Sequence, residues 1–308
     1  PLMLSPTALQ RAFHKDGERA VARAAAKFGI WFGISSLATH SIEEIAALTN
    51  GPKLFQLYVH KDKGLNASMI ERCREAQFDA LALTVDTIVS GKRERCLRSG
   101  FTTPPRFSAS SLWSYATRPR WTLEYVFGPK FRLPNLDGYV QEGTGRPVSI
   151  QDYFNTMLDT NMDWDTAARI RQDWGGTFAL KGVMSAADAR RAVEIGADAI
   201  WISNHGGRQL DGSRAPFDQL DEIVDAVGGE IEIILDGGVR RGTHILKSLA
   251  SGATAASGGR LYLYALAAAG QPGVERAILI LKEEIERGMR LMGVTSIDQL
   301  TADRLRWR

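Results

Sequence analysis

The sequence predicts a (β/α)8 barrel, also called a TIM barrel, with a long segment inserted after its fourth strand. Three observations support this α/β fold class. Amphipathic helices alternate with short apolar runs, as parallel strands require, because each needs a crossover connection. Eight apolar runs of this kind occur, which favours a closed barrel over an open sheet. The length of 308 residues also suits one such barrel.

The repeating unit is a helix rich in alanine and arginine, then a glycine, then a short apolar strand. It is clearest where the helix Arg19–Phe28 leads through Gly29 to a strand, and where Ala186–Ile195 leads through Gly196. The eight predicted strands are Leu2–Ser5, Ile30–Ser35, Leu54–Val59, Ala80–Val85, Phe178–Lys181, Ala199–Ser203, Ile231–Asp236 and Thr254–Gly258.

One segment interrupts this rhythm. About ninety residues separate the fourth and fifth strands, far more than one helix and two loops need. We therefore predict an inserted loop or lid at residues 97–165. Its stretch 106–132 mixes basic residues with aromatic ones, among them Trp113, Tyr115, Trp121, Tyr125, Phe127 and Phe131.

Composition and charge exclude several classes of protein. The formal net charge of +3 and the pI of about 8.9 are too weakly basic to indicate nucleic-acid binding. Two cysteines indicate no disulfide framework, so we expect a reducing cytoplasm. No apolar run approaches the roughly 20 residues of a membrane span. No spacing of cysteine and histidine predicts a metal site.

Polar residues cluster where the predicted strands end. In a closed barrel these carboxyl ends meet on one face, where the active sites of barrel enzymes lie. The sequence therefore predicts an active site on this face. The residues concerned are Gln56, Tyr58, Thr84, Asp86, Lys181, Asn204, His205 and Asp236.

The most specific motif runs from Ser203 to Asp211 and follows the sixth strand directly. Within it, His205 is a candidate general base, because histidine titrates near neutrality. Arg208 offers a planar guanidinium that suits a carboxylate. The alternative is a glycine-rich turn with a structural histidine, which we consider a poor match to the whole motif.

Two glycine-rich motifs follow the seventh and eighth strands, where barrel enzymes commonly bind phosphate. The first is Asp236-Gly237-Gly238-Val239-Arg240, and the second is Gly258-Gly259-Arg260. Backbone amides in such turns bind phosphate, and arginine adds charge-assisted hydrogen bonds. Either motif alone could be an ordinary turn, but together they predict a phosphorylated cofactor or substrate.

These motifs resemble those of the FMN-dependent 2-hydroxy-acid oxidases and dehydrogenases. That family includes glycolate oxidase, L-lactate dehydrogenase and mandelate dehydrogenase, and the chain is most similar to bacterial L-lactate dehydrogenase-like members. The resemblance extends from Pro1 to about Gly273. It rests on the His205 and Asp236 motifs and on the segments Pro6-Thr7-Ala8, Phe55-Gln56-Leu57-Tyr58-Val59, Leu83-Thr84-Val85-Asp86 and Lys181-Gly182.

The resemblance implies FMN as the cofactor. It places the backbone of Thr7 and Ala8 against the flavin near N5. Lys181 would face the N1–O2 edge, where its positive charge stabilises the anionic reduced flavin. The other implied contacts are Ser35, Gln56, Thr84 and Ser203 for the flavin, and Asp236, Gly238, Arg240, Gly259 and Arg260 for the ribityl chain and phosphate.

The resemblance also implies a reaction, the oxidation of an L-2-hydroxy acid to the 2-keto acid. His205 would be the catalytic base and Asp86 the carboxylate that orients it. Tyr58 would lie near the substrate hydroxyl, and Arg93 and Arg208 would bind the substrate carboxylate. Reduced FMN would then pass its electrons to quinone, a cytochrome or O2.

Leu37 stands where glycolate oxidase has a large aromatic residue, so we expect a substrate larger than glycolate. L-lactate is the first expectation, and mandelate or a longer 2-hydroxy acid the second. Two other functions remain open from the sequence. One is another FMN- or phosphate-binding barrel enzyme, such as an isomerase, and the other is a barrel that binds ligand without turnover.

The family resemblance carries further expectations about organisation. Residues 1–308 would form a single FMN-binding barrel domain, and an N-terminal cap would precede Pro1. The assembly would be a homotetramer or an octamer. The stretch 106–132 resembles the loop with which bacterial members contact the inner membrane, although a polar lid over the active site is an equal alternative.

Overall fold

The computed structural model describes residues 1–94, 98, 108–128, 131–138 and 155–306. Eight parallel strands close into a barrel in sequence order, with the first strand paired to the last. The predicted (β/α)8 fold is confirmed, and every strand lies close to its predicted limits. The strands are β1 (Leu2–Leu4), β2 (Trp31–Ser35), β3 (Lys53–Leu57), β4 (Ala80–Thr84), β5 (Thr177–Val183), β6 (Ala199–Ser203), β7 (Glu232–Asp236) and β8 (Ala255–Gly258).

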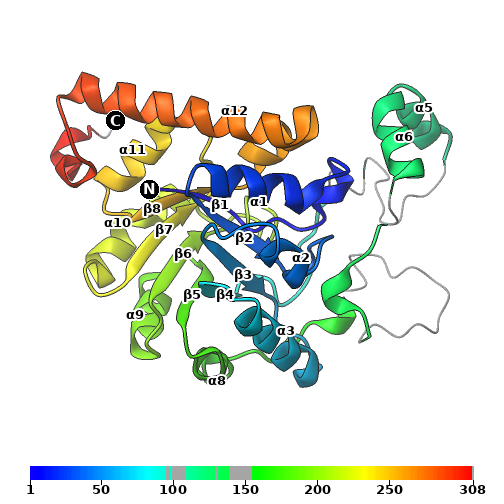
Figure 1. The fold of residues 1–308 in the computed structure, drawn as a ribbon. Coiled ribbons are helices and arrows are strands. Elements are labelled where there is room, and N and C mark those ends of the chain that lie inside the picture. Colours follow the sequence, from blue (N-terminus) through cyan, green and yellow to red (C-terminus); the bar gives the residue numbers. More distant parts are fainter. Residues whose placement is uncertain (95–97, 99–107, 129–130, 139–154, 307–308) are drawn as a thin grey trace.

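Helices surround the barrel (Figure 1). Several begin at a side-chain cap that binds a free amide of the first turn, as Asp62, Asp163 and Ser185 do. The helices that cover the barrel are α1 (Gly17–Lys27), α2 (Ile42–Ala46), α3 (Lys63–Glu75), α8 (Trp164–Trp174), α9 (Ala186–Glu194), α10 (Pro216–Val227), α11 (Gly242–Ala250) and α12 (Arg260–Met292).

The helix α12 is bent near its start. Gly270 has a left-handed φ of +61° and Pro272 follows it, and both residues interrupt regular helical geometry. The ring of His14 packs against this bend, since a Cβ at Gly270 would lie 2.8 Å from the His14 Nε2. The bend therefore admits the segment that follows β1.

The lower part of the barrel interior is filled by apolar side chains. Met3, Leu54 and Ile234 contribute to this cluster, together with Trp201, which is fully buried. Alanines on β4, β5 and β6 make room for the large indole ring. Because successive residues of a strand face opposite sides, the last inward position of each strand lies above this cluster.

The predicted insertion after β4 is confirmed. It carries α5 (Ala109–Ala116) and α6 (Pro119–Phe127), which stand apart from the barrel helices in Figure 1. Of the predicted segment 97–165, residues 97, 99–107, 129–130 and 139–154 lie outside the described residues. In the described part of the chain, no helix combines the length and the apolar character needed to cross a membrane.

Two contacts fasten the middle of the insertion to the barrel. The Trp121 Nε1 donates a hydrogen bond of 2.9 Å to the Ala12 carbonyl. Asn135 is buried and accepts from the Ile42 amide, while its neighbour Leu136 packs into the main core. The Trp121 contact holds α6 beside the segment that follows β1, and the Asn135 contact holds the short helix Pro134–Leu136 against α2.

A third contact fastens the end of the insertion. The Lys61 amide donates to the Met157 carbonyl, and the Asp159 amide donates to the Val59 carbonyl. Between them the buried His60 shares a hydrogen bond of 3.1 Å with the Asn66 Oδ1. Burial is the main reason that the pKa of His60 falls to about 4.

His60 predicts a loss of stability in mild acid. Below the ordinary histidine pKa of about 6.5, the unfolded chain binds a proton that the folded chain does not bind until about pH 4. Stability is therefore fully present above pH 6.5 and is lost as the pH falls toward 4. Between pH 7 and pH 5 the parent protein should lose about 2 kcal/mol of its free energy of unfolding through His60, and His60→Gln should not show this loss. Urea unfolding in the presence of excess FMN measures the free energy of unfolding at both pH values.

His244→Gln is the matched control, since His244 is not buried. It should retain the pH dependence of the parent protein. If His60→Gln and the parent lost stability equally between pH 7 and pH 5, the buried neutral histidine would not be the cause.

Candidate active site

The uppermost layer of the barrel interior is polar, and every strand contributes to it. In each strand, alternate residues face the interior of the barrel. The last of these inward-facing residues can form hydrogen bonds in all eight cases, and all eight residues are buried. Ser5 follows β1 directly, and the other seven lie within their strands. The eight are Ser5, Ser35, Gln56, Thr84, Lys181, Ser203, Asp236 and Ser257.

On one side of this polar layer, three residues from β2, β3 and β4 form a chain of hydrogen bonds. The Ser35 hydroxyl donates to the Gln56 Oε1 at 2.8 Å, and the Gln56 Nε2 donates to the Thr84 hydroxyl at 2.7 Å. All three were predicted to bind the flavin ring, and the structure places them side by side.

On the other side, three serines surround a buried ion pair. The Lys181 Nζ lies 2.7 Å from the Asp236 Oδ2, and Ser203 donates to the same oxygen at 2.9 Å. Ser5 donates to the Asp236 Oδ1 at 2.6 Å and also contacts Ser257 at 2.7 Å. Burial alone would raise the pKa of Asp236. The Lys181 charge and these hydrogen bonds outweigh it and hold the pKa below its usual value.

Above the polar layer, the loops after β3, β4 and β6 bring together three predicted catalytic residues. The His205 Nδ1 lies 3.1 Å from the Asp86 Oδ1, and the His205 Nε2 lies 3.5 Å from the Tyr58 hydroxyl. Burial would raise the pKa of Asp86, but the hydrogen bond and the charge of His205 outweigh it, so the pKa is lowered. Asp86 is therefore a carboxylate that can orient and stabilise an imidazolium.

The phenol of Tyr58 remains a neutral hydrogen-bond donor. Burial is the first cause of its raised pKa, and the Asp86 charge acts in the same direction. The charges of Arg93 and Arg208 oppose this rise, which places both predicted substrate-binding arginines near the phenol. Arg93 is half-buried and Arg208 is exposed.

His205 lies in an unusual backbone conformation. Its φ is +57°, and Gly206 and Gly207 continue with +69° and +68°. A left-handed conformation is rare for residues other than glycine and is a local strain that the surrounding structure must hold. It turns the imidazole back over the barrel opening, toward Asp86.

Gly182 makes the approach of Asp86 possible. Its φ is +107°, and a Cβ at this position would lie 2.6 Å from the Asp86 Cγ. The ladder between β5 and β6 shifts register around this residue. The predicted pair Lys181-Gly182 thus supplies a buried cation and the space for the neighbouring carboxylate.

The predicted binding site for the FMN phosphate lies at the start of α12. Among the described residues, no side chain caps this helix at Gly259, so the amides of its first turn can bind an anion. Arg260 flanks it and donates to the Gly206 carbonyl. Gly238, with a φ of +72°, has open space where a Cβ would stand. Arg240 makes no hydrogen bond through its side chain to a described residue.

Thr7 and Ala8, the predicted flavin contacts after β1, are positioned partly by Tyr262 and Gln10, which the sequence analysis did not identify. The hydroxyl of Thr7 lies 2.5 Å from that of Tyr262, and Gln10 donates to both. Ala8 packs against the main core. Thr7 also borders the predicted binding site for the phosphate, since a Cβ at Gly259 would lie 3.3 Å from its Cγ2.

Sequence reasoning also missed two residues of the catalytic cluster. The buried Thr87 donates to the Asp86 Oδ1 at 2.9 Å and lies 3.3 Å from the His205 Nδ1. The Gln209 side chain donates to the Asp86 carbonyl. Both are sequence neighbours of predicted residues, but only the folded chain shows their contacts.

This set of donors fits FMN. The amide and hydroxyl groups of the polar layer can bind the heteroatoms of a flavin, and the buried Lys181 supplies a positive charge beside them. The uncapped start of α12, with Arg240 and Arg260 beside it, suits a phosphate dianion. Among the described residues, no group of three or more His, Cys, Asp or Glu side chains could hold a metal ion.

Comparisons with known proteins agree with this fit. The family model described as FMN-dependent dehydrogenase matches residues 1–307. An L-lactate dehydrogenase of Alcaligenes faecalis is 40% identical over 312 residues, which cover 99% of this chain and 80% of the relative. A protein named putative L-lactate dehydrogenase from Mycobacterium tuberculosis is 38% identical over 302 residues, which cover 98% of this chain and 71% of that protein.

Solved structures give the same result. The monotopic membrane protein (S)-mandelate dehydrogenase superposes with a TM-score of 0.92 at 36% identity, covering 99% of this chain and 80% of that one. A (putative) lactate oxidase of Pediococcus acidilactici superposes with a TM-score of 0.80 at 32% identity, covering 97% and 74%. The chain therefore belongs to the FMN-dependent dehydrogenase family and is an FMN-dependent 2-hydroxy-acid oxidoreductase.

Proposed function

We propose that the protein oxidises an L-2-hydroxy acid, with L-lactate the first candidate, to the 2-keto acid. The observation that carries this proposal is the cluster of Tyr58, His205 and Asp86 above the buried Lys181–Asp236 pair. It sets a proton acceptor next to the predicted flavin site. FMN, when bound, takes up the two electrons that the substrate loses.

His205 is the proposed catalytic base. Its Nδ1 is occupied by Asp86, so Nε2 is the atom that takes the substrate proton. Asp86 then stabilises the imidazolium. Tyr58 donates to the substrate hydroxyl oxygen, and Arg93 and Arg208 hold the substrate carboxylate, which fixes the α-carbon in place.

The cofactor-binding residues take the roles that the family resemblance implies. Lys181 offers positive charge where the flavin gains electrons. The uncapped helix and its arginines bind the phosphate. The proposed set is Thr7, Ala8, Ser35, Gln56, Thr84, Lys181 and Ser203 for the ring, and Asp236, Gly238, Arg240, Gly259 and Arg260 for the ribityl chain and phosphate.

The family resemblance sets Leu37 where glycolate oxidase has a large aromatic residue, and this smaller side chain supports a substrate larger than glycolate. It is fully buried beside Ser35, whose hydroxyl accepts a hydrogen bond from the Leu37 amide. The relatives named L-lactate dehydrogenase support lactate, and the solved mandelate enzymes support an aryl substrate as the alternative. We further propose that residues 1–308 act as one FMN-binding domain within a homotetramer or an octamer.

The protein as purified with FMN should be yellow, and L-lactate should bleach it without oxygen. Mandelate is tested in parallel, and glycolate should reduce the flavin most slowly because the Leu37 side chain leaves room for a larger substituent. Stopped-flow spectroscopy near the visible flavin band measures each rate. Faster reduction by glycolate than by both larger acids would contradict the proposal that Leu37 makes room for a larger substrate.

The variant His205→Asn tests whether His205 is the catalytic base. Asparagine tolerates the left-handed backbone better than most residues, so the loop should keep its shape. Loss of the base should slow reduction by about 10²- to 10⁴-fold, while the visible spectrum reports that FMN is still bound. Unchanged reduction in this variant would exclude His205 as the base.

The two proposed carboxylate-binding arginines lie on loops that are fastened to each other. The Gln209 Nε2 donates to the carbonyls of Asp86 and Val89 at 3.2 and 3.1 Å. Gly91 packs so closely that a Cβ there would lie 2.1 Å from the Arg208 carbonyl oxygen. The contact therefore sets the distance between Arg93, which follows Gly91 by two residues, and Arg208.

Gly91→Ala should separate the two loops and weaken binding of the carboxylate. We expect the KM for the 2-hydroxy acid to rise about tenfold, equivalent to about 1.4 kcal/mol. The Kd of oxalate, measured from the flavin spectrum of the oxidised enzyme, should rise in parallel. Gln209→Met, which removes both hydrogen bonds at similar length, should act in the same direction.

Ser90→Ala, in the same loop, is the control for a general disturbance. An increase in KM for Ser90→Ala as large as for Gly91→Ala would show that the loop, and not the packing of Gly91, matters. An unchanged oxalate Kd in Gly91→Ala would contradict the proposed spacing of the arginines.

We also propose that α5 and α6 contact a membrane surface peripherally. Trp113, Leu123, Val126 and Phe127 are between 55% and 82% exposed, which is unusual for large apolar side chains. Arg118 is exposed beside them and donates to the Ser114 carbonyl, so it adds a positive charge that anionic lipids attract, whereas Arg120 is paired with Glu124 at 3.3 Å. The solved mandelate dehydrogenase described as a monotopic membrane protein supports this role. Of the predicted stretch 106–132, residues 106–107 and 129–130 lie outside the described residues.

Phe127→Ser should weaken binding to vesicles that contain anionic lipid by about tenfold, because one aromatic side chain no longer enters the interface. Leu291→Ser is the matched control, since Leu291 on α12 is also 82% exposed. Co-sedimentation at low and high salt measures both. A parent protein that never sediments with the vesicles, or equal losses in the two variants, would argue against the contact.

A further inference from the structure

The carboxylate of Glu18 is completely buried between two loops of the candidate active site. Glu18 lies in the first turn of α1, and its side chain has no exposed surface. One loop is residues 5–12, which follow β1 and include Thr7. The other is residues 36–40, which follow β2 and include Leu37. Removing a charge from water is costly, so such a carboxylate persists only where hydrogen bonds satisfy it.

Four hydrogen-bonding groups surround this carboxylate, and they come from both loops. The Gln10 amide donates to the Glu18 Oε1 at 3.2 Å, and the Thr39 amide donates to the same oxygen at 2.9 Å. The Thr39 hydroxyl donates to Oε2 at 2.5 Å, and the His40 Nδ1 lies 2.8 Å from that oxygen. These groups match the roughly four acceptor sites of a carboxylate. The N-terminal end of α1 also favours the negative charge.

The two loops are also joined to each other directly. The Leu9 amide donates to the Leu37 carbonyl at 3.1 Å. The Arg11 amide donates to the Thr39 hydroxyl at 3.3 Å. One hydroxyl therefore binds both Glu18 and the opposite loop, so a loss of the carboxylate would also disturb this direct contact.

Gly17 lets α1 approach both loops closely. Its φ is +43°, in the left-handed region that favours glycine. A Cβ there would lie 2.7 Å from the Arg11 Cγ in one loop and 3.3 Å from the His40 Cε1 in the other. The start of α1 is therefore packed against both loops at the point where Glu18 binds them.

The contacts of Glu18 continue toward both parts of the proposed site. Gln10, whose amide Glu18 binds, donates through its Nε2 to the Thr7 carbonyl at 3.2 Å. In the other loop, the Leu37 amide donates to the hydroxyl of Ser35, a proposed flavin contact. Glu18 thus lies at the junction of the segment proposed to contact the flavin and the side chain proposed to limit the substrate.

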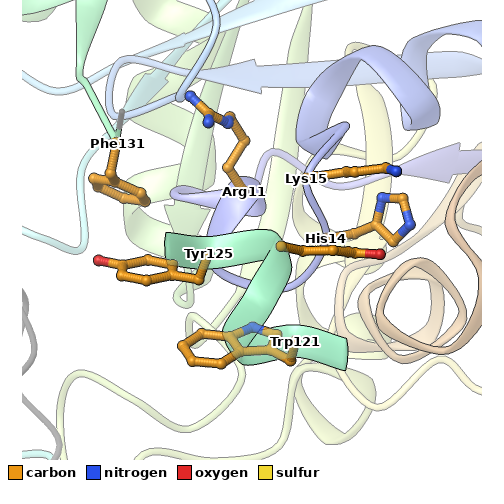
Figure 2. A pocket seen from close by; sticks show the side chains of 7 residues that line it. Arg11, His14, Lys15, Trp121, Tyr125 and Phe131 are labelled. Carbon is orange, nitrogen blue, oxygen red and sulfur yellow. The ribbon is translucent and has the colours of Figure 1, made fainter. Parts of the chain in front are cut away.

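The insertion holds the segment after β1 at a different place. Arg11 and Trp121 line one small pocket between this segment and α6 (Figure 2). The Trp121 Nε1 donates to the Ala12 carbonyl. That contact joins the segment to the insertion, whereas Glu18 joins it to the loop that carries Leu37.

We propose that Glu18 is a positioning residue that holds the loop carrying Leu37 against the segment after β1, and so sets the space for the side chain of the substrate. The inference rests on the proposed function and extends it to a residue outside the site. Glu18 acts through its hydrogen bonds and takes no part in proton or electron transfer. Without these bonds the loop would yield to a larger substituent on the α-carbon.

The test compares mandelate and L-lactate as reductants of the FMN-loaded protein without oxygen. In Glu18→Ala the mandelate-to-lactate ratio of the second-order rate constants for flavin reduction should rise at least fivefold. Glu18→Gln should keep the parent ratio, since its Oε1 still accepts from both amides and its Nε2 can donate to the Thr39 hydroxyl and the His40 Nδ1. An equal rise in Glu18→Gln would overturn the proposal, because the charge would then matter and not the hydrogen bonds.

Val21→Ala is the control for a general loss of stability. Val21 is fully buried on α1, so this variant weakens the packing of the same helix and leaves both loops bound to Glu18. Its ratio should equal that of the parent. A rise as large as in Glu18→Ala would overturn the proposal, because any weakening of α1 would then have the same effect.

Thr39→Val guards against a failure of Glu18→Ala to fold. It removes the hydroxyl that binds Glu18 and the Arg11 amide, so the ratio should rise here as well. Thr49→Val is its matched control and should keep the parent ratio. The Thr49 hydroxyl also accepts from an amide, that of Gly51, but it precedes β3 at the other end of the barrel. An unchanged ratio in Thr39→Val and in Glu18→Ala would overturn the proposal.

Hydrogen exchange gives a readout that needs no turnover. In the Glu18→Ala holoenzyme, the amides of residues 5–12 and 36–40 should exchange at least tenfold faster relative to those of α9. In Val21→Ala this relative rate should stay at the parent value. Parent-like exchange of both loops in Glu18→Ala would overturn the proposal. If no 2-hydroxy acid reduced the flavin, the proposed function would fail, and the exchange would still report whether Glu18 joins the loops.

Discussion

The buried ion pair between Lys181 and Asp236 is the interaction on which the site depends. Burying two charges is costly unless their remaining hydrogen-bonding capacity is satisfied. Here Ser5 and Ser203 bind the Asp236 carboxylate directly, and Ser257 contacts Ser5. These residues come from β5, β6, β7 and β8 and from the position after β1, so the pair can be stabilised only when the barrel is closed. Closure therefore builds the floor of the site.

The loops above this floor are arranged by backbone geometry as much as by side chains. His205 keeps a left-handed conformation that points it toward Asp86, and Gly182 leaves the space that Asp86 fills. Gly91 and Gln209 then join the two loops that carry the arginines. The proposed proton transfer and carboxylate binding would thus depend on one connected set of loop contacts, which is why we expect small changes far from the reacting atoms to alter substrate binding.

The insertion after β4 places α5 and α6, which carry the proposed membrane contact, close to the segment that follows β1. The contact of Trp121 with Ala12 holds α6 beside the segment that carries Thr7, and the contact of Asn135 with Ile42 holds the later part of the insertion against α2. The helix α6 has a half-buried aromatic face and an exposed apolar face. This arrangement places the proposed membrane contact beside the segment that carries Thr7, which is proposed to contact the cofactor.

The sequence by itself determined the barrel and placed each strand within two residues of its limits, and it proposed the site residues. These follow from local signals, namely the alternation of helix and strand and the motifs around His205 and Asp236. Only the tertiary structure decided which residues meet across the barrel. The contacts of Gln209 with Asp86, of Tyr262 with Thr7 and of Ser5 with Asp236 join residues more than one hundred positions apart. No local pattern specifies such contacts, because they exist only when eight strands close and bring their ends together.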